Sequence, residues 1–167
     1  MDKSNFESYI VPDLLDKNLI LVFVGTAPSR ISAKKICYYG NKNNRFWSTL
    51  FEIKLVDKLI MPEKYQELLT YRIGLTDIIK RQAGNDNELK VSENDIKEFE
   101  AKIKNYKPKV IALTSKNAYK FYYGKNCDYG LQLEEIFGAK VFVLPSTSPL
   151  AFKFWDIKYW KELKKII

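Results

Sequence analysis

Two loops of small and polar side chains are the first candidates for a site that could do chemistry. The loop GTAPS, at 25–29, carries no acid, amide or metal ligand. The loop PSTSPL, at 145–150, places three hydroxyl side chains between Pro145 and Pro149. Because proline restricts φ and has no N–H, the hydroxyls and remaining amides can point outward together and hold phosphate oxygens. An alternative is a tight turn whose hydroxyls cap a helix and whose Leu150 packs inward.

A third stretch, CYYGNKNNRFW at 37–47, combines aromatic rings with amides. Tyr39 can stack on a flat heterocycle, and Asn41 and Asn44 can hydrogen-bond the edge of that heterocycle. The alternative is a surface turn in which Asn44 caps the helix that follows. A further acid is Asp77 in GLTD, for which a buried turn or a cap is the simpler interpretation.

The amino-acid composition limits the kinds of catalytic group, metal site and partner that the chain could have. The chain has 28 Lys and Arg against 20 Asp and Glu, a formal charge of +8, which favours a polyanionic partner, although a lysine-rich composition can also be a genomic bias. Histidine is absent, which removes the commonest general base, the usual catalytic triads and most zinc sites. Cys37 and Cys127 are too few for a disulfide framework or a cysteine-ligated iron–sulfur cluster. Any catalysis must therefore rely on carboxylates, amides, hydroxyls or backbone groups, and we expect no metal or iron–sulfur cluster.

The cysteines and the start of the chain also bear on location. Both cysteines are expected to be reduced thiols of a cytoplasmic protein. The first residues lack the basic region and apolar run of a signal peptide, and no later run reaches the length of a membrane span.

Strand and helix patterns alternate along the chain. Continuous apolar runs predict strands buried on both faces at 19–24, 109–114 and 139–145. A long loop is expected from 25 to about 44, and 73–81 is undecided between strand and turn. Helical patterns occupy 45–56, 62–72, 92–106 (with Ser92 and Asp95 in capping-box spacing), 115–124 and the C-terminal segment. This alternation predicts a parallel sheet covered by helices, with both small-residue loops at one edge, where ligands bind.

Four motifs in order carry a resemblance that spans roughly 19–160. VGTAPS, YYGNKNNRFW, GLTDIIKR and LPSTSPL together resemble the uracil-DNA glycosylase superfamily, nearest its mismatch-specific uracil/thymine and hypoxanthine-DNA glycosylase branches. The resemblance implies a single domain over 1–167, an α/β/α sandwich of three layers around a mostly parallel, four-stranded sheet. It also implies a monomeric base-excision-repair enzyme that needs no cofactor and is associated with the nucleoid when bound to DNA. Such an enzyme flips a deaminated base, uracil or hypoxanthine, out of DNA and hydrolyses its N-glycosidic bond.

Roles follow by position within these motifs. The resemblance assigns the walls of the base pocket to Gly25, Thr26, Ala27, Pro28 and Tyr39. It assigns contacts with DNA to Ser29, Arg30, Ser146, Thr147, Ser148 and Lys153, and the place of a wedge between base pairs to Leu150.

The chain departs from the family at two positions. Many branches hold Asp or Asn where this chain has Ala27, and some use His where it has Ser146. The hypoxanthine-DNA glycosylase branch also lacks the first-motif Asp or Asn and relies on an Asn downstream. The resemblance therefore makes Asn41 and Asn44 the candidate catalytic residues, whose amides would orient water and bond the base rather than accept a proton. Ala27 also leaves open a catalytically inactive module that binds DNA damage on the same scaffold. An enzyme that acts on free nucleosides is a third alternative.

Overall fold

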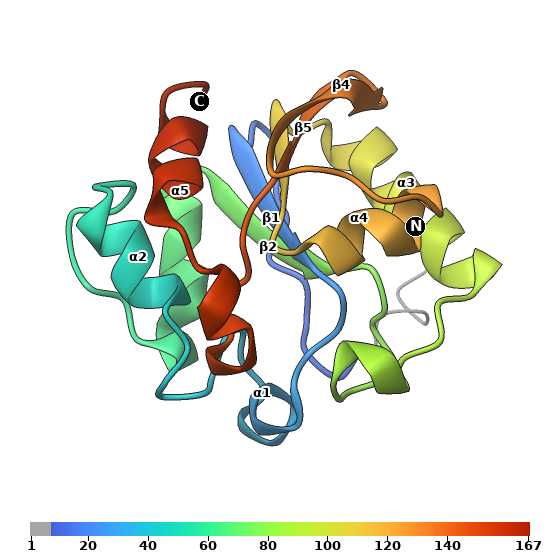
Figure 1. Ribbon diagram of the computed structural model, residues 1–167, viewed down its shortest axis with the longest axis horizontal. Helices are drawn as coiled ribbons and strands as arrows, with labels where there is room; N and C mark the ends of the chain where they lie inside the picture. Colours follow the sequence, from blue (N-terminus) through green and yellow to red (C-terminus); the bar gives the residue numbers. More distant parts are fainter. Residues whose placement is uncertain (1–7) are drawn as a thin grey trace.

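The computed structural model describes residues 8–167 as three layers, with a central sheet between two groups of helices (Figure 1). The strand order is β2-β1-β3-β5-β4. The four parallel strands are β1 (Leu21–Gly25), β2 (Ile73–Asp77), β3 (Val110–Leu113) and β5 (Ala139–Val143). The α/β/α architecture expected from the sequence is confirmed, and the undecided segment at 73–81 begins with a strand.

The sheet has five strands rather than the expected four. The additional strand, β4 (Gly130–Ile136), runs antiparallel to β5 at the edge of the sheet. Its residues, GLQLEEI, alternate between exposed and less exposed positions, with Leu133 fully exposed. A strand that is exposed along one face lacks the continuous apolar run that marks the central strands, so the search for such runs missed it.

Alternate residues of the central strands build two separate cores. Phe23 of β1 belongs to the core under α2 (Phe46–Glu52), the 3-10 helix η2 (Pro62–Tyr71) and α5 (Ile157–Lys164). Its neighbour Val24 belongs to the core under α3 (Glu93–Tyr106) and α4 (Lys116–Tyr123). Because β-strand side chains alternate between faces, one apolar run supplies both cores and anchors helices on both sides of the sheet.

The helices follow the sequence patterns with local differences. Ser92 and Asp95 form the expected capping box at the start of α3. The expected helix at 62–72 is a 3-10 helix, and α2 ends at Glu52, before the end of its apolar pattern. Within the expected loop at 25–44, α1 (Arg30–Lys35) is capped by the Ser29 side chain. Two short 3-10 helices, η3 (Asp86–Glu88) and η4 (Pro149–Phe154), complete the fold.

Over 8–167, none of the helices combines the length and the apolar character that crossing a membrane requires.

Candidate active site

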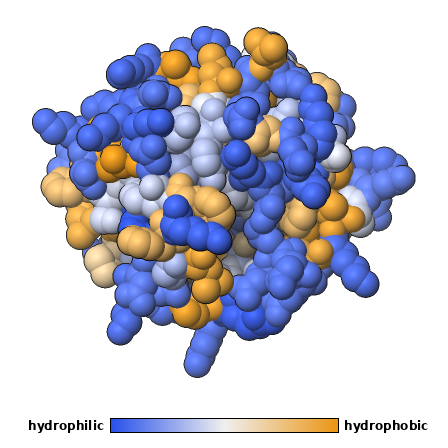
Figure 2. All heavy atoms as spheres, viewed as in Figure 1, coloured by the Kyte–Doolittle hydropathy of each residue, from blue (hydrophilic) through white to orange (hydrophobic). Residues whose placement is uncertain are grey.

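A cleft of about 820 Å³ opens where the parallel strands end. All four sequence motifs contribute to its lining, together with residues 84–87 and 114–117. In Figure 1 the loops that form it gather near α1, at the lower end of the sheet. Pale and orange atoms occupy the middle of this face of the molecule, and hydrophilic atoms surround them (Figure 2). The placement agrees with the rule that ligands bind beyond the carboxyl ends of strands in α/β folds.

A carboxylate lies in this cleft, at the end of β2. Asp77 lines the cleft although its residue surface is only 4% exposed. Among the described residues, none donates a hydrogen bond to its Oδ2 atom. Burial raises the pKa of Asp77 to about 6, because desolvation disfavours the charged carboxylate. At neutral pH this group is an ionised carboxylate with a free acceptor oxygen and a pKa suited to taking a proton.

The GTAPS loop is a rigid wall of the cleft. Backbone N–H groups of Ile78 and Ile79 donate to the carbonyls of Gly25 and Thr26, at 3.0 and 2.8 Å. The methyl group of Ala27 lines the cleft but offers no chemistry of its own. The loop therefore contributes shape and backbone groups.

Thr26 also belongs to a polar cluster that joins three segments. Its hydroxyl donates to Asp86 Oδ1 at 2.6 Å, and the Asn117 side-chain amide donates to Asp86 Oδ2 at 2.7 Å. All three residues line the cleft. With one hydrogen bond on each carboxylate oxygen, Asp86 is held in place as an acceptor at the cleft wall.

Tyr39 lines the cleft with one face of its ring already covered. The ring stacks on Phe46, with centroids 3.8 Å apart and an angle of 15° between the planes. Thr114 donates its hydroxyl proton to the Val24 carbonyl at 3.3 Å, so the Tyr39 hydroxyl is the donor in its 3.2 Å bond to Thr114. A stacked base could use the opposite face of Tyr39 only.

The side-chain oxygens of the two candidate asparagines are occupied. Asn41 Oδ1 accepts from the Asn43 backbone N–H, and Asn44 Oδ1 accepts from the Phe46 backbone N–H, both at 2.9 Å. Asn44 thus binds the first N–H of α2 from the position before the N-cap residue, Arg45, whose own side chain makes no cap bond. Both asparagines line the cleft, so what they can offer a ligand there is amide N–H. Their catalytic roles stay predictions.

The PSTSPL loop presents Leu150 to solvent at one rim of the cleft. Leu150 is 78% exposed, which excludes the inward-packed alternative. The Ser146 and Ser148 hydroxyls accept from backbone N–H groups within the loop, and Thr147 is buried. The hydroxyls therefore cap the local 3-10 turn, whereas the last helix, α5, is capped by Asp156.

A direct bond joins the second and fourth motifs. The Arg45 backbone N–H donates to the Thr147 carbonyl at 3.1 Å. The Arg45 guanidinium lies over the rings of Phe152 and Trp155, at 4.8 and 5.7 Å from the centroids. The loop with Leu150 is in this way attached to the segment that carries Asn41 and Asn44.

The predicted phosphate contacts are divided between the cleft and its surroundings. Ser29 and Arg30 line the cleft and are exposed, although the Ser29 hydroxyl caps α1 and Arg30 pairs with Glu88 at 2.7 Å. Lys153 is exposed but lies outside the cleft lining. Contact with DNA stays a prediction for each of them.

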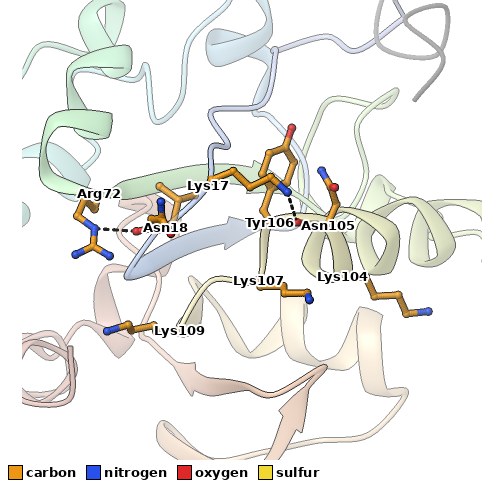
Figure 3. A pocket seen from close by; sticks show the side chains of 9 residues that line it. Lys17, Asn18, Arg72, Lys104, Asn105, Tyr106, Lys107 and Lys109 are labelled. Carbon is orange, nitrogen blue, oxygen red and sulfur yellow. Dashed lines mark hydrogen bonds between the residues drawn. The ribbon is translucent and has the colours of Figure 1, made fainter.

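A second hollow, of about 510 Å³, lies near the amino ends of β1, β2 and β3 (Figure 3). Two of its cations bond backbone carbonyls: Lys17 to Asn105 at 3.0 Å, and Arg72 to Asn18 at 2.8 Å. Lys104 and Lys107 lie at the end of α3, where cations stabilise the helix dipole. Local structure thus accounts for most of the charge in this hollow. Over residues 8–167, including this hollow, no cluster of three or more His, Cys, Asp or Glu could hold a metal ion.

The cleft contains three polar residues that had little or no role in the predictions from sequence. Asp77 was a minor candidate, and Asp86 and Asn117 were not candidates. Asp77 had the signal of an acid directly after a strand, but its burial is visible only in the fold. Asp86 and Asn117 carried no signal that separates them from surface polar residues.

Comparison with known proteins identifies the family of the chain. Residues 12–164 match the family described as the Uracil DNA glycosylase superfamily. The fold is similar to the solution NMR structure of a candidate uracil DNA glycosylase from Methanosarcina acetivorans, with a TM-score of 0.64 and 26% identity. That similarity covers 90% of this chain and 91% of the other. The chain belongs to the uracil-DNA glycosylase superfamily.

Proposed function

We propose that this protein is a DNA glycosylase of base excision repair that hydrolyses the N-glycosidic bond of a deaminated base, uracil or hypoxanthine. The observation that carries the proposal is Asp77, a carboxyl group buried in the cleft where the strands end. The family match and the charge of +8 support DNA as the partner.

Asp77 supplies the chemistry that the first motif lacks. Its free oxygen accepts a proton from a water molecule that attacks the sugar carbon. The same negative charge stabilises the cationic sugar that develops as the bond to the base breaks. Amide N–H groups of Asn41 and Asn44 donate to the departing base, which leaves with negative charge. This places the proton acceptor on Asp77 and leaves the asparagines as donors.

The substrate base enters the cleft by flipping out of the DNA. A base within a duplex is inaccessible, so it must leave the stack and enter the cleft. Leu150, exposed at the rim, fills the space that the base vacates. Tyr39 offers its uncovered face to the flipped base.

A panel of duplexes tests the proposal. Uracil-, hypoxanthine- and xanthine-containing DNA would be incubated with excess enzyme, and abasic sites would be detected by alkaline strand scission. We expect cleavage with at least one base, and a loss of about 100-fold or more for Asp77→Asn, the range that removing a general base causes. Asp16→Asn, at an exposed acid outside the cleft, is the control and should keep the wild-type rate.

Ala27 favours one alternative, a module that binds damaged DNA without cutting it. That protein would bind DNA in a salt-sensitive way and produce no alkali-labile sites with any of the three bases. Cleavage that Asp77→Asn leaves unchanged would instead keep the glycosylase and reject Asp77 as its base.

A further inference from the structure

Behind Asp77 lies a lysine that has almost no contact with solvent. The Lys80 side chain is 2% exposed, and its Nζ atom lies 3.9 Å from Asp77 Oδ2. The same Nζ atom donates to the Tyr38 hydroxyl at 2.9 Å and lies 2.9 Å from Asp13 Oδ1. Lys80 therefore joins two buried carboxylates.

A second lysine completes the cluster. Lys102 Nζ lies 2.7 Å from Asp13 Oδ2, and its side chain is 4% exposed. The Thr76 hydroxyl donates to Asp13 Oδ1 at 2.7 Å. The two lysines and two aspartates balance in charge and come from the segment before β1, from β2 and the turn after it, and from α3.

Placing four charged groups inside the protein carries a large desolvation penalty. Burial of an ionic group costs several kcal/mol before its partners compensate, and well-packed apolar side chains of similar volume are often as stabilising. Among its four charged members, Asp77 lines the cleft, whereas Asp13, Lys80 and Lys102 lie behind it. Asp77 is thus the one charge of the cluster that lines the cleft where a substrate would bind.

We propose that Lys80 is a positioning residue that keeps Asp77 ionised and oriented in the cleft, and that Asp13 and Lys102 fix Lys80 in place. The proposal rests on the function proposed above, in which Asp77 accepts the proton of water. It adds that the reactivity of Asp77 is set by a residue that does not touch the substrate.

The groups around Asp77 act in opposite directions. Desolvation is the largest effect and raises the pKa of Asp77, whereas the positive charges of Lys80 and Lys102 lower it, and the negative charge of Asp13 raises it. Burial raises the pKa of the neighbouring Tyr38 and Tyr39 hydroxyls, so both are neutral where Asp77 titrates. Removal of Lys80 should therefore shift the titration of Asp77 to higher pH, and neutralisation of Asp13 should shift it to lower pH.

The test compares Lys80→Met with Lys102→Met, a matched change of a buried lysine that pairs with Asp13 instead of Asp77. Single-turnover base release would be followed from pH 5 to 9, and the Asp77 side-chain carboxyl carbon would be titrated by NMR.

We expect Lys80→Met to move both the acidic limb of the pH–rate profile and the titration of the Asp77 carbon upward by about one pH unit or more, consistent with a charge about 4 Å away. For a shift of one unit, the defect should be about fivefold larger at pH 6 than at pH 9. Lys102→Met should shift both by less than half as much, and Asp13→Asn should shift both downward.

Equal shifts for the two lysine variants, or no shift for Lys80→Met, would overturn the proposal. A titration that moves as expected while Asp77→Asn still cleaves DNA would support the role of Lys80 and reject the catalytic role of Asp77. If Lys80→Met does not fold, the wild-type protein provides the measurement. The Lys80 Nζ chemical shift should then change with pH, with the same midpoint as the titration of the Asp77 carboxyl carbon. A Lys80 Nζ shift that does not change at this pH would refute the contact.

Discussion

Gly25 and Asp77 are paired residues at the ends of adjacent parallel strands, and they lie too close for any side chain to fit between them. A Cβ atom on Gly25 would come within 2.5 Å of Asp77 Oδ1. Glycine at position 25, the first residue of the GTAPS loop, therefore allows the Asp77 carboxylate to approach the backbone of β1.

This closeness predicts the effect of Gly25→Ala. The added methyl group must displace the Asp77 carboxylate, which we expect to cut base release by tenfold or more and to lower the free energy of unfolding by about 1–3 kcal/mol, as overpacking does. Denaturant unfolding and single-turnover cleavage would measure the two effects. Gly124→Ala is the control: it has a positive φ but no atom within 4 Å of the added Cβ, so it should cost stability and spare activity.

Asp77→Asn should make the protein more stable at neutral pH while it abolishes cleavage. The folded-state pKa of Asp77, about 6, exceeds its value in an unfolded chain, about 4, so the folded protein binds this proton more tightly. The contribution of Asp77 to stability therefore falls as pH rises from about 4 to 6 and stays unfavourable above that, by at most about 3 kcal/mol. We expect Asp77→Asn to raise the melting temperature at pH 8 but not at pH 4. A lower melting temperature at pH 8 would contradict the burial argument.

Leu150→Ala should affect duplex DNA more than single strands. A side chain that fills the vacated space matters only where a stack has to be opened. Because Leu150 is exposed, its removal should change the free energy of unfolding by no more than about 0.5 kcal/mol. Rates on matched duplex and single-stranded substrates would be compared, with Leu133→Ala, at a fully exposed position on β4, as the control. Equal losses on both substrates would exclude a wedge.

Two substitutions at Asn44 separate its structural role from a role in catalysis. Asn44→Ala removes the acceptor for the first N–H of α2 and should cost about 1 kcal/mol of stability. Asn44→Asp keeps the acceptor for the Phe46 N–H but loses the side-chain N–H groups, so it should preserve stability and reduce cleavage if the amide donates to the leaving base. Wild-type cleavage by Asn44→Asp would confine this residue to capping. Asn41→Ala and Asn41→Asp make the same comparison in the neighbouring turn.

The layered fold could be predicted because its signals are local. The runs ending at Val24 and Leu113 are apolar throughout, which marks strands buried on both faces. β4 carries no such run, since its outer face meets solvent, and the pattern around Leu133 reads equally well as a loop. Short 3-10 helices such as η4 depend on prolines and caps that also occur in irregular turns.

The site could be predicted in outline only. The loops with Ala27 and Leu150 were placed together because parallel strands end at the same edge of a sheet. The burial of Asp77 in the cleft could not be read from the sequence, because it depends on residues that are distant along the chain. Lys80 is three residues from Asp77 but also contacts Asp13, which no local pattern links to it.

The bond between the Arg45 N–H and the Thr147 carbonyl bears on the flipping step of the proposed function. It joins the segment proposed to hold the extruded base to the loop proposed to take its place in the duplex, so the spacing of these two parts does not have to form when DNA binds. On that function, most of the deformation falls on the nucleic acid. Sites where pairing is already weak deform at lower cost, so we expect a lesion in a mismatch to be processed faster than the same lesion in a stable pair.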